Sequence, residues 1–213
     1  MLRPLVLSRL GYCEDSQVIT DAKMRFKDFI LRHKPIPPDL RGTVFALTCR
    51  FGADEELTQM RKLYESSDSS EIQRQCLQAI GRCPHTDVQN HALEFAISKN
   101  CRLQDNYLVF YGLTRTLAGQ EKAWKFFRNN MNLLCDLFGS QDNGLFIHIL
   151  KMSIMHHCSE EKAEDIQNFF EHRTVSPALT RPISQSLENI NLNIKFLRNN
   201  ASAIGAWLKE EGY

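Results

Sequence analysis

Residues 120–138, QEKAWKFFRNNMNLLCDLF, carry the clearest helical pattern of the chain. Its large apolar residues are spaced alternately three and four positions apart, at Trp124, Phe127, Met131, Leu134 and Phe138. Because an α-helix turns once in about 3.6 residues, these five side chains fall on one face. The stretch therefore predicts a helix with a single apolar stripe, which another element has to cover.

The same periodicity recurs on both sides of this stretch, and no alternating run of β-branched residues predicts a strand. Proline, glycine or serine clusters separate the periodic segments and leave only short links, which favour antiparallel neighbours. A long series of such helices cannot close as a four-helix bundle. The sequence predicts an all-α, HEAT-like or armadillo-like superhelix of antiparallel helix pairs, with residues 1–213 forming one helical domain. The expected helices span about 15–33, 40–51, 54–64, 71–82, 87–99, 103–117, 120–138, 144–156, 159–172 and 178 to the end.

Composition and charge exclude several classes of function. The net charge of +1, from 26 basic and 25 acidic residues, gives no electrostatic footprint for nucleic acid or an anionic membrane. No stretch has the length of a membrane span. The basic residues Arg41, Arg50, Arg61 and Lys62 fall on different helical units, so we interpret them as parts of solvated faces.

Cysteine usage bears on the compartment. The chain has seven cysteines, an odd number without close pairing, and most of them lie inside apolar helical patterns. They are expected to be reduced thiols that act as small apolar residues. This favours a cytoplasmic location, with the lumen of the secretory pathway as the alternative.

Motifs that carry chemistry are missing. There is no H-E-x-x-H helix, C-x-x-C pair or G-x-S-x-G elbow, and the ten glycines do not cluster into a phosphate loop. In His156-His157-Cys158, adjacent residues diverge by about 100° around a helix, which favours helix-end histidines over metal ligands. Trp124, Phe127 and Trp207 are expected in the core. The sequence predicts no catalytic residue, no metal ligand and no cofactor within this chain.

Several strings nevertheless resemble a known family. Ala123-Trp124-Lys125-Phe126-Phe127 leading to Asn130 is similar to a signature in the C-terminal domain of the M1 zinc aminopeptidases. The final segment, from Asn189 through Phe196-Leu197 to Trp207-Leu208, resembles the closing pattern of that domain, although Phe196 replaces an expected tryptophan. Further matches, in the same order, are Pro38-Asp39-Leu40-Arg41, Arg102-Leu103-Gln104-Asp105 and Phe169-Phe170-Glu171. The resemblance covers about residues 5–208 and is closest to the puromycin-sensitive type.

This resemblance implies a non-catalytic role. In that family the zinc ligands, the general base and the exopeptidase motif lie in a preceding domain, so zinc is expected only there. The C-terminal domain is a bowl of HEAT-like repeats that bounds the peptide cavity. The implied partners are the aminopeptidase catalytic domain and a peptide substrate. His148 stands where related sequences commonly have an arginine, and His148 and Lys151 are the candidate contacts to the peptide cavity.

Two other functions stay open at this point. The chain could be a free-standing helical-repeat scaffold that binds a protein partner, or an enzyme of unrecognised type. The first helical segment bears on the scaffold hypothesis, because Leu5, Val6, Leu7 and Leu10 make it apolar from its start. A free-standing solenoid needs a polar cap there, so this segment is expected to require a neighbour and to belong to something larger.

Overall fold

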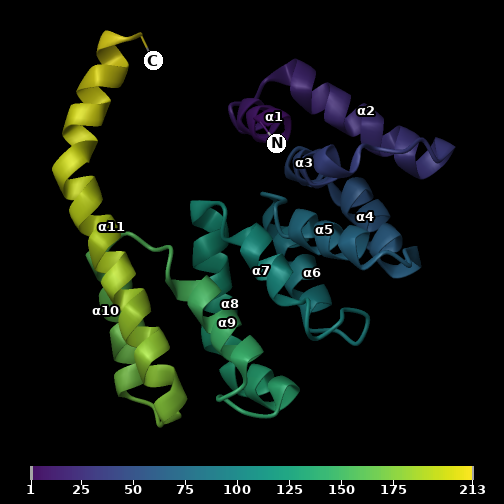
Figure 1. The fold of residues 1–213 in the computed structure, drawn as a ribbon. Coiled ribbons are helices and arrows are strands. Elements are labelled where there is room, and N and C mark those ends of the chain that lie inside the picture. The colour runs from purple at the N-terminus through teal and green to yellow at the C-terminus, as the bar shows by residue number, and fades with distance from the viewer. Residues whose placement is uncertain (1, 213) are drawn as a thin grey trace. The chain divides into compact units, whose positions relative to one another are not determined.

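The computed structural model describes residues 2–212, and every regular element in this range is helical. This confirms the all-α prediction. The helices are α1 (Leu2–Tyr12), α2 (Ser16–Arg32), α3 (Pro38–Arg50), α4 (Asp54–Ser66), α5 (Ser70–Ile80), α6 (Thr86–Ala96), α7 (Tyr107–Leu113), α8 (Leu117–Phe138), α9 (Gly144–Ile154), α10 (Glu160–Glu171) and α11 (Pro177–Glu210) (Figure 1). In the described part of the chain, none of them combines the length and apolarity that crossing a bilayer requires.

Contacts divide the chain into two compact units, residues 1–122 and 123–213. The division falls within α8, a few residues after its start. That the whole chain acts as one domain stays a prediction, and the two units are described separately below.

The first unit consists of helix pairs. Helices α2 and α3, α4 and α5, and α6 and α7 pack as consecutive pairs, and α1, α3, α5 and α7 also contact one another in sequence. The second helix of each pair thus joins a common row. Packed helix pairs of this kind are consistent with the predicted HEAT-like superhelix.

Local sequence explains where these helices begin. Asp15 and Ser69 accept hydrogen bonds from the backbone N–H groups of Val18 and Ile72, so their side chains cap α2 and α5. Pro38 occupies the first position of α3, where its missing N–H leaves no hydrogen bond unmade. These residues set the positions at which α2, α3 and α5 begin.

In the second unit, the stripe of α8 forms an aromatic core. The Trp124 side chain is 2% exposed; its ring lies 5.2 Å from that of Phe169, edge to face, and its Nε1–H donates to Asp165 over 2.7 Å. Phe127 packs against Phe146 of α9, with 5.5 Å between ring centroids. The core positions predicted for Trp124 and Phe127 are therefore confirmed. Asn130 leaves helical geometry and marks a bend in α8.

Helix α11 differs from the others because only its first part is covered. Its buried residues are Leu179, Ile183, Ser186 and Ile190, where it packs on α9 and α10. The rest of this 34-residue helix has no buried residue, and Trp207 is 55% exposed. The prediction that Trp207 lies in the core is wrong, because α11 continues past the helices that could cover it.

The cysteines behave as small apolar residues. All seven are free, and Cys49, Cys76, Cys83 and Cys101 are buried. Burial raises the pKa of the Cys101 thiol to about 12, so this thiol stays protonated at neutral pH. This agrees with the structural role predicted for the thiols, while the compartment stays a prediction.

Two glycines set the distance between α5 and α7. A Cβ atom at Gly81 would lie 2.1 Å from the carbonyl oxygen of Val109, and one at Gly112 would lie 2.3 Å from that of Gln78. Real Cβ atoms do not approach so closely, so only glycine permits this backbone contact. The ends of the two helices are therefore held closer together than larger residues would allow.

We expect Gly112→Ala to destabilise the protein by about 1–3 kcal/mol, because the added methyl group meets the backbone of α5. Gly42→Ala is the matched control: Gly42 also lies inside a helix, and its nearest neighbour to an added Cβ is 4.0 Å away. The control should be neutral or stabilising by about 0.4–1 kcal/mol. The free energy of unfolding is measured by urea denaturation. Equal shifts for both variants would show that the contact imposes no constraint.

Candidate functional site

Arginine and tyrosine side chains gather where the row of helices α1, α3, α5 and α7 ends. Tyr12 and Arg50 are the last residues of α1 and α3, and Arg82 and Arg115 follow the ends of α5 and α7 by two positions. We call Arg50, Arg82 and Arg115 the arginine cluster. All of its members lie in the first unit.

Tyrosine rings hold the cluster together. The guanidinium carbon of Arg50 lies 4.7 Å from the centre of the Tyr12 ring, and that of Arg82 lies 5.7 Å from the same ring. Arg115 stacks on Tyr111 at 4.3 Å and donates a hydrogen bond to its hydroxyl group. A cation over the face of an aromatic ring is attracted by the ring's electron distribution. The tyrosines thus orient guanidinium groups that come from three helices.

The cluster carries positive charge without a matching carboxylate. Among residues 2–212, no Asp or Glu side chain forms an ion pair with any of its three members. Burial, followed by the like charge of Arg115, lowers the pKa of Arg82. The buried Nε–H groups of Arg50 and Arg82 also lack a hydrogen-bond partner in the protein. No carboxylate of the described residues therefore balances this positive charge directly.

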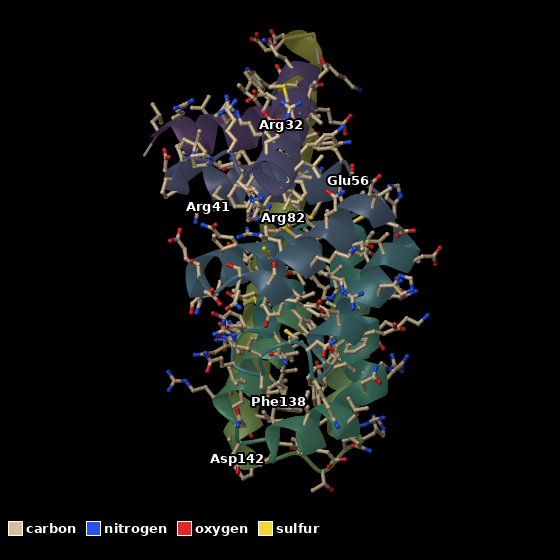
Figure 2. The ribbon with its side chains drawn as sticks, turned by 90° about the vertical axis from the view of Figure 1, so that its right-hand side faces the viewer. Arg32, Arg41, Glu56, Arg82, Phe138 and Asp142 are labelled. Atoms are coloured by element: carbon tan, nitrogen blue, oxygen red, sulfur yellow. The ribbon has the colours of Figure 1, made fainter. Side chains whose placement is uncertain are left out.

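This arrangement differs from the expected solvated faces. That interpretation is wrong for Arg41, whose side chain is 13% exposed beside Glu71, while Arg50 and Arg61 are half-buried and Lys62 is exposed. Figure 2 labels Arg41 and Arg82 in the first unit, together with Glu56, whose carboxylate accepts from the Ala53 N–H at 2.9 Å. Sequence reasoning missed the cluster because its residues are more than 30 positions apart. The sequence does carry one signal of the cluster: an arginine stands at or just after the end of α3, α5 and α7, the successive helices of the row.

The chemistry of the cluster is that of anion binding. Guanidinium groups present planar pairs of donors that match carboxylate and phosphate oxygens. A cation at a helix C-terminus is favoured by the helix dipole by about 0.3–1 kcal/mol, which accounts for the position of each arginine. The dipole does not account for buried donors without partners. The cluster can hold an anionic group and offers no nucleophile or general base.

The residues proposed from the sequence lie elsewhere. His148 and Lys151 are three positions apart on α9, in the second unit. Partial burial, followed by the charge of Lys151, lowers the pKa of His148, so this imidazole is neutral at pH 7. His156 is exposed and His157 is buried. In the described range, no three His, Cys, Asp or Glu side chains are grouped to hold a metal ion.

Comparison with known proteins decides the family. Residues 1–192 match the family model of the ERAP1-like C-terminal domain. This chain belongs to that family. The ERAP1-like domain is the C-terminal part of the M1 aminopeptidases, so the resemblance inferred from the sequence is confirmed.

Full-length aminopeptidases are among the relatives of this ERAP1-like domain. It is 32% identical to the puromycin-sensitive aminopeptidase of Caenorhabditis elegans over 99% of this chain and 23% of that protein. It is 26% identical to aminopeptidase M1-A of Oryza sativa subsp. japonica, over 99% of this chain and 24% of the relative. For aminopeptidase N of Rattus norvegicus, the identity is 24% over 84% of this chain and 19% of the relative. The chain spans about a quarter of the length of its first relatives, and their catalytic domain is absent from it.

We expect a small dicarboxylate such as glutarate to raise the melting temperature of the protein, because it binds the folded arginine cluster. In Arg82→Gln this rise should be lost or halved at constant ionic strength. The control is Arg32→Gln, which removes an exposed arginine of α2. Differential scanning fluorimetry measures the shift. A rise of the same size in all three proteins would contradict an anion site at the cluster.

Proposed function

We propose that this chain is a non-catalytic C-terminal domain of an M1-type aminopeptidase, and that it shapes or gates the peptide-binding cavity of a catalytic domain it does not contain. Family membership over residues 1–192 supports this proposal. The observation that carries it furthest is the arginine cluster, whose charge has no carboxylate partner in the described chain. The partners are then the catalytic domain and the peptide substrate.

Peptides suit a site of this kind. An extended peptide carries a terminal carboxylate and, in many sequences, acidic side chains, and both accept the paired donors of a guanidinium group. A surface of stacked helix pairs is also long enough to contact an extended chain. The cluster would bind the anionic part of a peptide and leave its hydrolysis to zinc chemistry in the other domain.

His148 and Lys151 are retained as further candidate contacts to the peptide cavity. A neutral imidazole beside a lysine offers one acceptor or donor next to a positive charge. Such a pair could hydrogen-bond a peptide carbonyl, whereas the arginine that the family resemblance implies at this position would present a second charge. These two residues remain proposals that rest on the resemblance of the sequence to the aminopeptidase family.

A free-standing helical scaffold is the second candidate. The exposed apolar residues of α1 bear on both candidates, since Leu2, Leu5, Val6 and Leu10 are all at least 41% exposed and leave a face that requires a neighbour. A contiguous apolar face of this kind marks a surface that binds another protein. The same face would serve a catalytic domain, so the identity of the protein bound separates the two candidates. For either, the free thiols support the cytoplasm over the secretory lumen.

The proposal is tested with fluorescently labelled acidic peptides, whose binding is followed by fluorescence anisotropy. We expect Arg82→Gln to weaken binding roughly tenfold, because it removes charge-assisted hydrogen bonds worth about 1.4 kcal/mol or more. Arg32→Gln should leave the affinity unchanged. An amidated peptide without acidic residues should bind the wild type and the Arg82→Gln variant with the same affinity.

Hydrolysis provides the complementary measurement. The purified chain should not cleave an aminoacyl-aminomethylcoumarin, with or without added zinc. Cleavage that a chelator abolishes would overturn the non-catalytic assignment. If affinity capture finds a specific partner other than an aminopeptidase, and the acidic peptides do not bind, the scaffold candidate replaces the proposal.

A further inference from the structure

The uncovered part of α11 carries a continuous apolar stripe. Beyond Ile190, six of its large apolar residues are exposed to solvent by between 37% and 63% while Ile194 is half-buried, and Figure 1 shows this end of the helix continuing past α10. The exposed residues are Leu192, Phe196, Leu197, Ile204, Trp207 and Leu208. An apolar surface of this length normally has a partner in solution.

The stripe follows the pattern of a helix that pairs with another helix. Leu197, Asn200, Ile204 and Trp207 are separated by three, four and three positions, the spacing of the contact seam in a coiled coil. At about 100° per residue, the opposite face carries Lys195, Arg198, Ser202 and Lys209. The amide of Asn200, in the middle of the stripe, donates to the Phe196 carbonyl oxygen over 2.8 Å. One of its two N–H groups is therefore satisfied without a partner chain.

From Phe196 to Leu208, the stripe is also symmetric about a centre that lies level with Ser202. Counting outward from this position, Asn200 corresponds to Ile204, Leu197 to Trp207 and Phe196 to Leu208. Each apolar residue of the outer pairs thus has an apolar counterpart at the same distance on the other side. In an antiparallel pair with a two-fold axis at this level, residue i of one copy contacts residue j of the other and the reverse contact also forms, so each of these apolar residues meets an apolar counterpart.

The centre of the stripe allows a close approach. Ala201 and Ala203 flank it, one on each side, about 80° around the helix from the middle of the stripe. Small residues at the crossing point let two helices pack with axes about 8–10 Å apart. The bulky side chains on either side can then reach across to the neighbouring helix.

The exposed area is sufficient for a specific contact. An aromatic side chain buries about 150–250 Å², and the exposed stripe residues each leave about half of such a surface open, so one copy offers on the order of 500 Å². Two copies then bury on the order of 1,000 Å², which is the lower limit for a specific interface. The association is expected to be weak to moderate.

We propose that the stripe of α11 binds the same stripe on a second copy of this chain, with the two helices antiparallel and the two-fold axis level with Ser202. Leu197 of each copy then packs against Trp207 of the other, and Phe196 packs near Leu208. The antiparallel direction is favoured because α9 and α10 cover the first part of α11. In a parallel pair, both sets of covering helices would lie at the same end and compete for space.

Sedimentation velocity over a range of concentrations tests for the dimer in the full chain. Wild type should pass reversibly from monomer to dimer. Phe196→Lys should weaken the dimer at least tenfold, because it places a charge in the contact. The matched control is Met24→Lys on α2, where the original side chain is 56% exposed, against 58% for Phe196. Met24→Lys should dimerise like wild type, and circular dichroism should show the same helix content in all three proteins.

Paired charges test the direction of the helices. Leu197→Lys and Trp207→Glu should each weaken the dimer, and the double variant should recover most of the lost affinity, since an antiparallel pair sets each new lysine against a new glutamate. In a parallel pair the like charges would face each other and no recovery would occur. A monomer at all concentrations, a dimer that resists Phe196→Lys, or a double variant without recovery would overturn the proposal. The first outcome would leave the stripe to a different protein or domain.

Discussion

The backbone contact between Gly81 and Gly112 is the constraint on which the candidate site depends. These two glycines let α5 and α7 touch where each helix ends. Arg82 and Arg115 follow these ends by two positions, so the contact brings two like charges together; burial, and after it the charge of Arg115, lowers the pKa of Arg82. Any larger residue at either position would separate the helices and with them the guanidinium groups. The packing of the first unit and the closeness of its arginines therefore share one cause.

Much of the fold was predictable because each helix is encoded by its own residues. The three-and-four spacing from Trp124 to Phe138 specifies a helix without reference to the rest of the chain, and the structure places that stripe in a core. Breakers such as Pro37 and Pro38 likewise act locally, and α3 begins where they stand. The segment expected over 103–117 forms a helix only from Tyr107 to Leu113, since turns replace its first part. Boundaries of this kind depend on packing that no local pattern records.

The site was harder to predict because it depends on residues far apart in the chain. Arg50 taken alone resembles any surface arginine at the end of a helix, and its partner ring, Tyr12, lies 38 positions earlier. Only the arrangement of the row brings α1, α3 and α5 side by side. Trp207 shows the converse, since its spacing is that of a core residue while its surroundings leave it exposed. A periodic pattern specifies which face of a helix is apolar, but not what covers that face.

The two tryptophans of the chain have opposite environments, and this gives the protein two internal spectroscopic reporters. Trp124 is enclosed by the rings of Phe127, Phe169 and Phe170, with its N–H bonded to Asp165. Trp207 faces water at the far end of α11. Emission from Trp124 is therefore blue-shifted and shielded from acrylamide, whereas emission from Trp207 is red-shifted and open to quenching. With Trp124 as an internal reference, the emission wavelength of Trp207 reports directly on whether the end of α11 is covered.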